Sequence, residues 1–236
     1  LGDPSSILKL LGTNTVIGPV LLNAGTIDAD ESSTLSSDLT LGGSATIDVA
    51  QEKTLTYEGA SLSLGANTLT VAGAGTLSNP SGYVLGDPES VMKLTGTNTV
   101  SGPLSLNAGV IDVDESTILN SLTLGGSAAV DVAQDKTLTY EGAALSLGEN
   151  TLTISGAGTL SNASGYVLGD PSSILKLLGT NTVIGPVSLN AGTIDVDESS
   201  ALNSDLTLGG TARISLAEGK TLSYEGASIS IDANIL

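Results

Sequence analysis

The stretch LGDPESVMKLTGTNTVSGPLSLNAGVIDVDES, residues 85–116, decides the fold because the chain contains it three times in closely similar form. One copy occupies residues 1–32 and another occupies residues 168–199. The first residues of the copies are 84 and then 83 positions apart. A period of this size is typical of a repeat protein, in which each unit buries its apolar face against the next and the chain grows along one axis.

The repeat predicts one continuous domain, 1–236, without linkers. Its tandem units span 1–84, 85–167 and 168–236, and the third unit is truncated because ISIDANIL stands where the first unit has LSLGANTLT. The chain begins at the first residue of a unit and stops inside the third, which is expected of a piece of a longer array.

Short apolar alternations recur every six to eight residues and predict short strands bounded by turn residues. In the first unit they are ILKL from residue 7, TVI from 15, VLL from 20, TIDA from 26, TL at 34, LTL from 39, TIDV from 46, TLTY from 54, LSL from 62, TLTV from 68, TLS from 76 and YV at 83. TIDA, TIDV and TLTV start 20 and 22 residues apart, which is one coil of three strands. The predicted fold class is therefore all-β, a parallel β-helix or β-solenoid, whose eleven coils make a rod on the order of 50 Å long.

Comparison of the copies separates an interior from an exterior. Positions that the alternation places inward stay aliphatic, in the sets Leu8, Met92 and Leu175; Val20, Leu104 and Val187; Ala29, Val113 and Val196; Val49, Val132 and Leu216; and Leu64, Leu147 and Ile231. Positions placed outward change their chemistry freely, in the sets Leu21, Ser105 and Ser188; Ile17 and Ser101; Thr46, Ala129 and Arg213; and Asp48, Asp131 and Ser215. This difference indicates a tube with a dry aliphatic interior and an exposed outer wall.

The amino-acid composition limits the classes of partner that the chain can bind. The chain has 25 Asp and Glu against 7 Lys and Arg, a formal net charge of −18, which opposes binding to nucleic acid and to anionic membranes. No apolar run approaches the ~18 residues that a membrane span needs. We expect neither a nucleic-acid partner nor membrane insertion.

The chain lacks His and Cys, which excludes Ser-His-Asp and Cys-His catalysis, disulfides and His or Cys metal sites. Paired carboxylates remain available for sugar hydrolysis, but no Phe or Trp is present to stack a sugar ring, and the acidic cluster recurs in every unit where an enzyme builds one cleft. We predict that the chain is not an enzyme, and we assign no catalytic, cofactor-binding or metal-binding residue.

The acidic run Asp28, Asp30 and Glu31 is the best candidate for a metal site. Its counterparts are Asp112, Asp114 and Glu115 in the second unit and Asp195, Asp197 and Glu198 in the third. Asp28 is expected one coil from Asp48, roughly 5 Å away, where a hard cation such as calcium could bridge the two. The spacing matches neither an EF-hand loop nor a calcium-binding nonapeptide repeat. We favour a solvated acidic face that lysines offset, and keep a calcium- or glycan-binding face as the alternative.

Thr-x-Thr pairs are a further feature, because outward threonine ladders on flat solenoid faces are used to bind ice. The pairs start at Thr13, Thr54 and Thr68, which are 41 and 14 residues apart. This spacing is interpreted as placing the pairs on different faces, so a regular ice-binding plane is not predicted.

Segments such as LKLLGTNTVIGPVLLNAGTIDAD and TLTVAGAGTLSN resemble the passenger-associated repeats of bacterial autotransporters and related giant adhesins. Those repeats run as a Leu-x-Leu-x-Gly-x-Asn-Thr strand, a Gly turn and then Leu-Asn-x-Gly-Thr-Leu/Ile. The match covers residues 10–27, 94–111 and 177–194, and the chain departs from the family in its regular super-repeat. The resemblance implies a right-handed β-helix exported across the bacterial envelope.

We therefore expect a structural and adhesive segment of a long secreted or cell-surface bacterial protein, serving as a stalk or filament in cell adhesion or biofilm formation. The expected partners are neighbouring repeats of the same chain, other copies stacked end to end, and a cell-surface or glycan partner.

Overall fold

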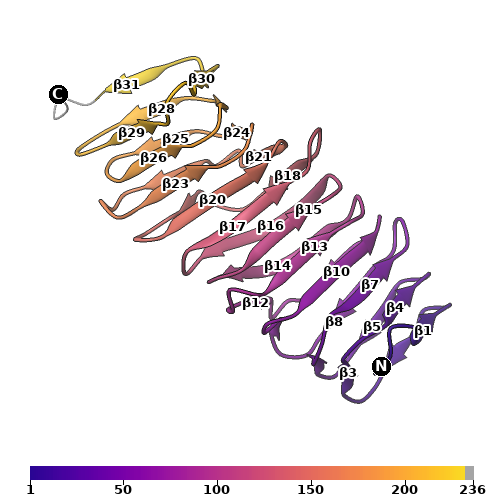
Figure 1. The fold of residues 1–236 in the computed structure, drawn as a ribbon. Helices are drawn as coiled ribbons and strands as arrows, with labels where there is room; N and C mark the ends of the chain where they lie inside the picture. The colour runs from indigo at the N-terminus through magenta and orange to yellow at the C-terminus, as the bar shows by residue number, and fades with distance from the viewer. Residues whose placement is uncertain (232–236) are drawn as a thin grey trace.

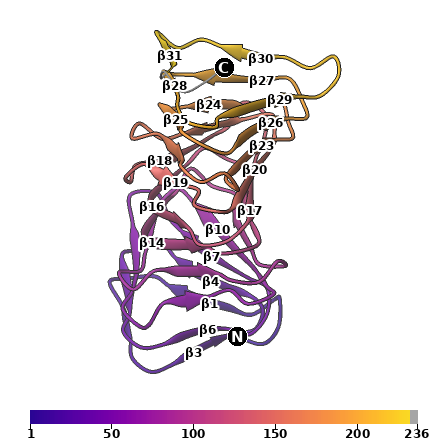
Figure 2. The same cartoon turned by 90° about the vertical axis from the view of Figure 1, so that its left-hand side faces the viewer.

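Parallel strands stacked in eleven coils make up the computed structural model, which describes residues 1–231. Figure 1 shows the coils following one another from the N-terminus to the C-terminus, which lie at opposite ends of the rod. Figure 2 shows the same order from the side, with β3 and β6 near the N-terminal end and β27 and β30 near the other. The described residues form no helix. The predicted β-solenoid is confirmed.

Each coil contributes a strand to sheet A, a strand to sheet B and a segment to a third face, named face C. Sheet A contains β1 (Ile7–Leu10), β4 (Thr26–Ala29), β7 (Ala45–Val49), β10 (Thr68–Gly73), β13 (Val91–Leu94), β15 (Val110–Val113), β17 (Ala128–Val132), β20 (Thr151–Gly156), β23 (Ile174–Leu177), β26 (Thr193–Val196) and β29 (Arg213–Leu216). Sheet B contains β2 (Thr15–Val16), β5 (Ser33–Leu35), β8 (Thr54–Tyr57), β11 (Thr76–Ser78), β14 (Thr99–Leu106), β16 (Thr117–Leu124), β18 (Thr137–Tyr140), β21 (Thr159–Ser161), β24 (Thr182–Ile184), β27 (Ser200–Asn203) and β30 (Leu222–Tyr224).

Face C contains β3 (Val20–Leu22), β6 (Leu39–Leu41), β9 (Leu62–Ser63), β12 (Tyr83–Leu85), β19 (Leu145–Ser146), β22 (Tyr166–Leu168), β25 (Val187–Leu189), β28 (Leu206–Leu208) and β31 (Ile229–Ile231). The C-terminal parts of β14 and β16 complete it, since β12 pairs with the Leu104 end of β14. All twelve apolar alternations of the first unit are strands, as predicted.

The strand register follows the predicted coil length only approximately, because partners in neighbouring strands of sheet A are 19 to 24 residues apart. Thr26 faces Thr46, and Asp28 faces Asp48, as the 20-residue spacing predicts. Thr46, however, faces Thr70 and not Thr68. The prediction is wrong by two residues here because Ala45–Val49 of β7 pairs with Leu69–Gly73 at the end of the six-residue strand β10 and not with the TLTV at its start. The same step recurs at β20.

The interior is aliphatic at nearly all of the positions predicted to point inward. Leu8 and Val20 are only partly buried, because no described coil lies above the first one. The prediction for Leu216 is wrong, since its side chain is 51% exposed. Leu216 lies in β29, the last strand of sheet A, so no further strand covers it. The side chain of Ile231 lies outside the described residues.

Four tyrosines lie inside the aliphatic tube, two in each complete unit: Tyr57, Tyr83, Tyr140 and Tyr166. The hydroxyl of Tyr83 donates to the carbonyl of Leu77 at 3.3 Å, so its polar atom is paired. Burial raises the pKa of the Tyr83 and Tyr166 hydroxyls above the ordinary value. The alternation in TLTY marks Tyr57 as inward, but the prediction of the core considered aliphatic residues alone.

At some positions in the corners between sheets A and B, the backbones of successive coils lie so close that no side chain fits between them. A Cβ added to Gly96 would lie 1.7 Å from the carbonyl oxygen of Gly73 in the preceding coil. Only glycine permits this close stacking of two backbones. At other turns an Asn side chain stabilises the loop that contains it. For example, the Asn67 Nδ2 donates to the carbonyl of Leu64, three residues earlier, at 2.9 Å.

Candidate functional site

The acidic run is held by a lysine of the preceding coil. Lys9 and Asp28 are partners in the pairing of β1 with β4, so they point outward side by side. The Lys9 Nζ lies 2.7 Å from the Asp28 Oδ2 and 3.0 Å from the Asp30 Oδ2. The counterparts are Lys93 with Asp112 (2.6 Å) and Asp114 (2.7 Å), and Lys176 with Asp195 (3.4 Å) and Asp197 (2.8 Å). The expected offset of the acidic face by lysines is confirmed.

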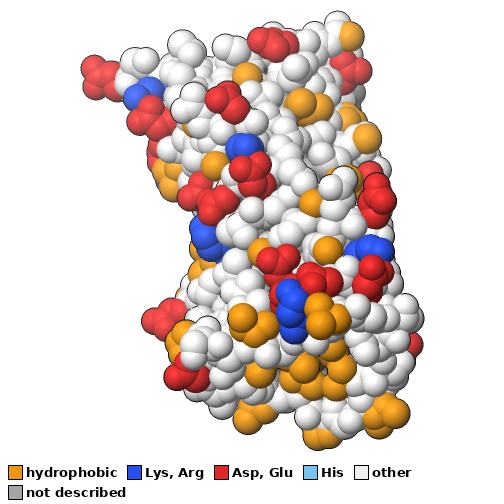
Figure 3. Space-filling view, turned by 90° about the vertical axis from the view of Figure 1, so that its right-hand side faces the viewer, with side chains coloured by type: hydrophobic (Ala, Val, Ile, Leu, Met, Phe, Trp, Pro, Cys, Tyr) orange, Lys and Arg blue, Asp and Glu red, His pale blue; other side chains and the backbone are white. Residues whose placement is uncertain are grey.

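A second ion pair in each unit joins the same coil to the next one. The Lys53 Nζ lies 2.6 Å from the Glu31 Oε2, and the same distance separates Lys136 from Glu115 and Lys220 from Glu198. Figure 3 shows Lys and Arg side chains beside Asp and Glu on one face of the rod. These pairs are partly exposed, so each contributes little stability alone.

The lysine ammonium groups therefore pair with the acidic runs from neighbouring coils, and no ion pair found among the described residues includes Asp48, the second carboxylate of the bridge that was considered. Within the residues that the structure describes, no group of three or more Asp or Glu side chains is arranged to hold a metal ion. Asp48 faces Asp28, and burial, followed by the charges of Asp28 and Asp30, raises the pKa of the Asp48 carboxyl. The charge of Lys9 opposes this shift.

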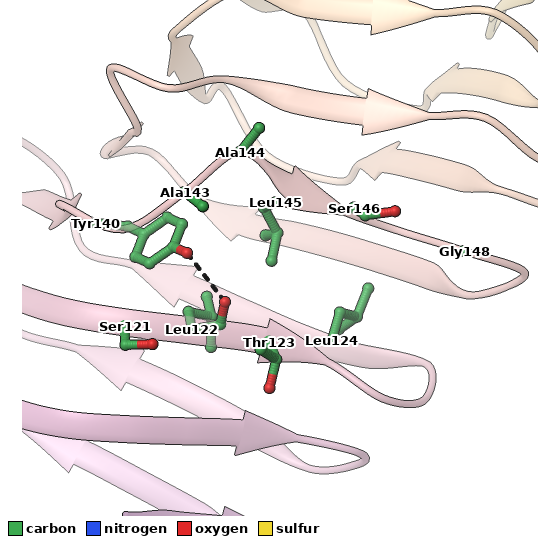
Figure 4. A pocket seen from close by; sticks show the side chains of 10 residues that line it. All are labelled: Ser121, Leu122, Thr123, Leu124, Tyr140, Ala143, Ala144, Leu145, Ser146 and Gly148. Atoms are coloured by element: carbon green, nitrogen blue, oxygen red, sulfur yellow. Dashed lines mark hydrogen bonds between the residues drawn. The ribbon is translucent and has the colours of Figure 1, made fainter. Parts of the chain in front are cut away.

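Face C is hollowed where the strands of two successive coils are not paired. In the second unit, β16 and β19 lie in neighbouring coils without joining one sheet, and the same is true of β6 and β9 in the first unit. The gap in the second unit is a cleft of about 420 Å³, shown in Figure 4. The Tyr140 hydroxyl closes one side of this cleft by donating to the Leu122 carbonyl at 3.1 Å. The matching cleft of the first unit, beside Tyr57, has a volume of about 260 Å³.

The wider cleft accompanies the one-residue difference between the units. The first unit has Asp38 before its LTL strand, whereas Ser121 directly precedes the LTL of the second unit. The Asp38 Oδ1 accepts from the Ala60 amide in the next coil at 3.3 Å, and Asp205 of the third unit accepts from Ser228 at 2.9 Å. Without this residue the second unit loses that bridge between coils, and β16 runs unbroken across the corner.

The side chains lining the cleft supply hydroxyl and apolar groups but no carboxylate or amine. They belong to Ser121, Leu122, Thr123, Leu124, Tyr140, Ala143, Ala144, Leu145 and Ser146, with Gly148 at the rim. The cleft therefore brings together no acid and base pair for catalysis. The sequence analysis did not predict it, and its signal is the missing residue before Leu122.

The prediction that the Thr-x-Thr pairs lie on different faces is wrong for two of the three. Thr15 and Thr56 belong to one column of sheet B, because both face Thr34 of the coil between them. The pair that starts at Thr68 lies in β10 of sheet A.

The chain matches no protein-family model, no curated protein and no solved structure. Over the described residues there is also no helix long and apolar enough to cross a membrane. The resemblance to autotransporter repeats stays a prediction from the residues.

Proposed function

We propose that this chain is a structural and adhesive segment of a long secreted or cell-surface bacterial protein, in which it acts as a stalk or filament. One observation carries the proposal: sheet A runs without a break through all eleven coils, and each unit presents the same ion pairs on its outer wall. Such a fold yields length and a repeated surface. An enzyme concentrates its chemistry in one cleft.

The contacts between coils favour a stiff rod. Each coil is joined to the next by parallel strand pairing and by a continuous aliphatic interior. The pairs Lys9–Asp28 and Glu31–Lys53 add bridges across two successive coil boundaries. The net charge of −18 keeps rods apart in solution, as a surface filament requires.

Removal of one unit tests the stalk. Deletion of residues 85–167 joins Val84 to Leu168, which restores the Val-Leu junction present at Val167. We expect the rod to shorten by about 19 Å, four coils at ~4.8 Å each, without a loss of thermal stability. Small-angle scattering measures the length, and an unchanged length would refute the stalk.

Adhesion is tested with beads coated with the 236-residue chain and added to bacterial cells. We expect the coated beads to bind, and beads coated with the shortened chain to bind less. Coated beads that bind no better than albumin-coated beads would remove the adhesive part of the proposal.

Calorimetry with millimolar calcium checks the alternative function, a calcium-binding face. We expect neither heat nor a change in melting temperature, because lysines already pair with the acidic runs.

A further inference from the structure

Sheet B presents a continuous face without charged side chains. Every charged residue that lies in a described strand belongs to sheet A: Lys9, Asp28, Asp48, Lys93, Asp112, Asp131, Lys176, Asp195 and Arg213. Face C is also uncharged in its described strands, but it is interrupted at β6/β9 and β16/β19 and exposes Leu21. In a chain with a net charge of −18, the strands of sheet B thus form a neutral strip along the rod, which the exposed Glu58 and Glu141 border where β8 and β18 end.

Hydroxyl side chains form columns on this surface. One column runs through five successive coils: Thr15, Thr34, Thr56, Ser78 and Ser101. Beside it stands the column Thr54, Thr76 and Thr99, and a second block repeats the pattern with Thr137, Thr159 and Thr182 next to Thr139 and Ser161. The alternating residues Leu35, Leu55 and Leu77 are buried, so the hydroxyl-bearing side chains point outward. Ile118 separates the two blocks.

The columns form a two-dimensional array with fixed spacings. Neighbouring members of a column are ~4.8 Å apart, and residues i and i+2 of one strand are ~6.8 Å apart. Each threonine adds a methyl group beside its hydroxyl. No aromatic ring lies in the array to stack against a sugar, because Tyr57 and Tyr140 point into the core.

We propose that the outer face of sheet B binds ice. An ice surface is neutral and repeats its oxygen atoms in two dimensions on the same scale as the array. Closely spaced methyl groups order the water next to them, and hydroxyls fix that water by hydrogen bonds. A charged side chain would hold its own hydration shell instead. The absence of charge from the strands of sheet B thus favours the same ligand as the hydroxyl columns. This activity goes beyond the structural role proposed above.

Two matched variants of the 236-residue chain test the proposal. Thr76→Arg places a long cation in the middle of a sheet B column. Thr46→Arg places the same residue in the column Thr26, Thr46 and Thr70 of sheet A, where Arg213 is the natural counterpart of Thr46 in the third unit. Circular dichroism and thermal melting establish that both variants fold. Thr159→Arg, in the second block, provides a second disruption of sheet B if Thr76→Arg does not fold.

The measurements are thermal hysteresis, the gap between the melting and freezing temperatures of a single ice crystal, and the partition of protein into slowly growing ice. We expect hysteresis and partition into ice for the wild type and for Thr46→Arg, and loss of most of both for Thr76→Arg and Thr159→Arg. Exclusion of the wild type from ice without hysteresis would overturn the proposal. Equal loss in Thr46→Arg would overturn it as well, as would binding to insoluble chitin or cellulose by a chain that ice excludes.

Discussion

Asp48 is a residue whose negative charge, next to that of Asp28, lowers the stability of the fold. It faces Asp28 and takes part in none of the ion pairs found among the described residues. Its carboxyl pKa is raised in the fold, first by burial and then by Asp28 and Asp30. A raised carboxyl pKa means that the ionised form destabilises the fold at every pH above the folded value, and that this cost disappears as the pH falls through it.

The substitution Asp48→Asn is therefore expected to raise the free energy of unfolding at pH 7 by about 0.5 kcal/mol, a value reduced by solvent screening. The gain should vanish below about pH 4, where unfolded Asp also binds a proton. Urea denaturation at pH 7 and pH 3 measures both. Asp38→Asn removes the same charge outside sheet A, at the residue before β6, and keeps the oxygen that accepts from Ala60. An equal gain in this control would contradict the argument.

At the scale of the strand and the coil, most of the fold could be predicted from the sequence. Because inward and outward residues alternate around a dry interior, a slip of one residue would bury polar side chains, and the pattern therefore determines the strands. The hydroxyl columns of sheet B could also have been predicted from the sequence. The 41 residues from Thr15 to Thr56 are two coils, of 19 and 22 residues. The clefts of face C do not follow from the alternation, because they depend on hydrogen bonds between coils that the alternation does not encode. Only the wider cleft has a sequence signal, the residue missing before Leu122.

The missing residue of the second unit can be restored as a test of that dependence. Insertion of Asp between Ser121 and Leu122 recreates the Ser-Asp-Leu of residues 204–206. We expect its carboxylate to accept from an amide near Ala143, narrowing the cleft and raising stability by about 1 kcal/mol. Hydrogen exchange at Ala143 and Ala144 should slow in the variant. Insertion of Ser at the same place is the control, and equal slowing there would show that loop length rather than the carboxylate is responsible.

At the scale of the whole molecule, the two ends of the rod differ from its middle. Val16 of the first coil is only partly buried, whereas its counterpart Val100 is covered by the coil before it. Near the other end, Leu216 and Ile229 are about half exposed. Both ends also present strand edges that no described strand pairs. Such edges favour stacking of one chain on another, and the net charge of −18 opposes it.

The balance between these two effects predicts association that depends on salt. In about 0.5 M NaCl charges are screened within roughly 5 Å, so end-to-end oligomers should appear that are absent at low salt. The variant Ile7→Pro should prevent them. The carbonyls of Ser6 and Leu10 accept from Thr26 and Asp30, so the Ile7 amide points to the open edge, where proline removes a donor without breaking the β1–β4 pairing. Sedimentation velocity of both proteins at both salt concentrations decides the question. A wild type that stays monomeric in high salt, or a variant that associates equally, would show that the strand edges do not drive stacking.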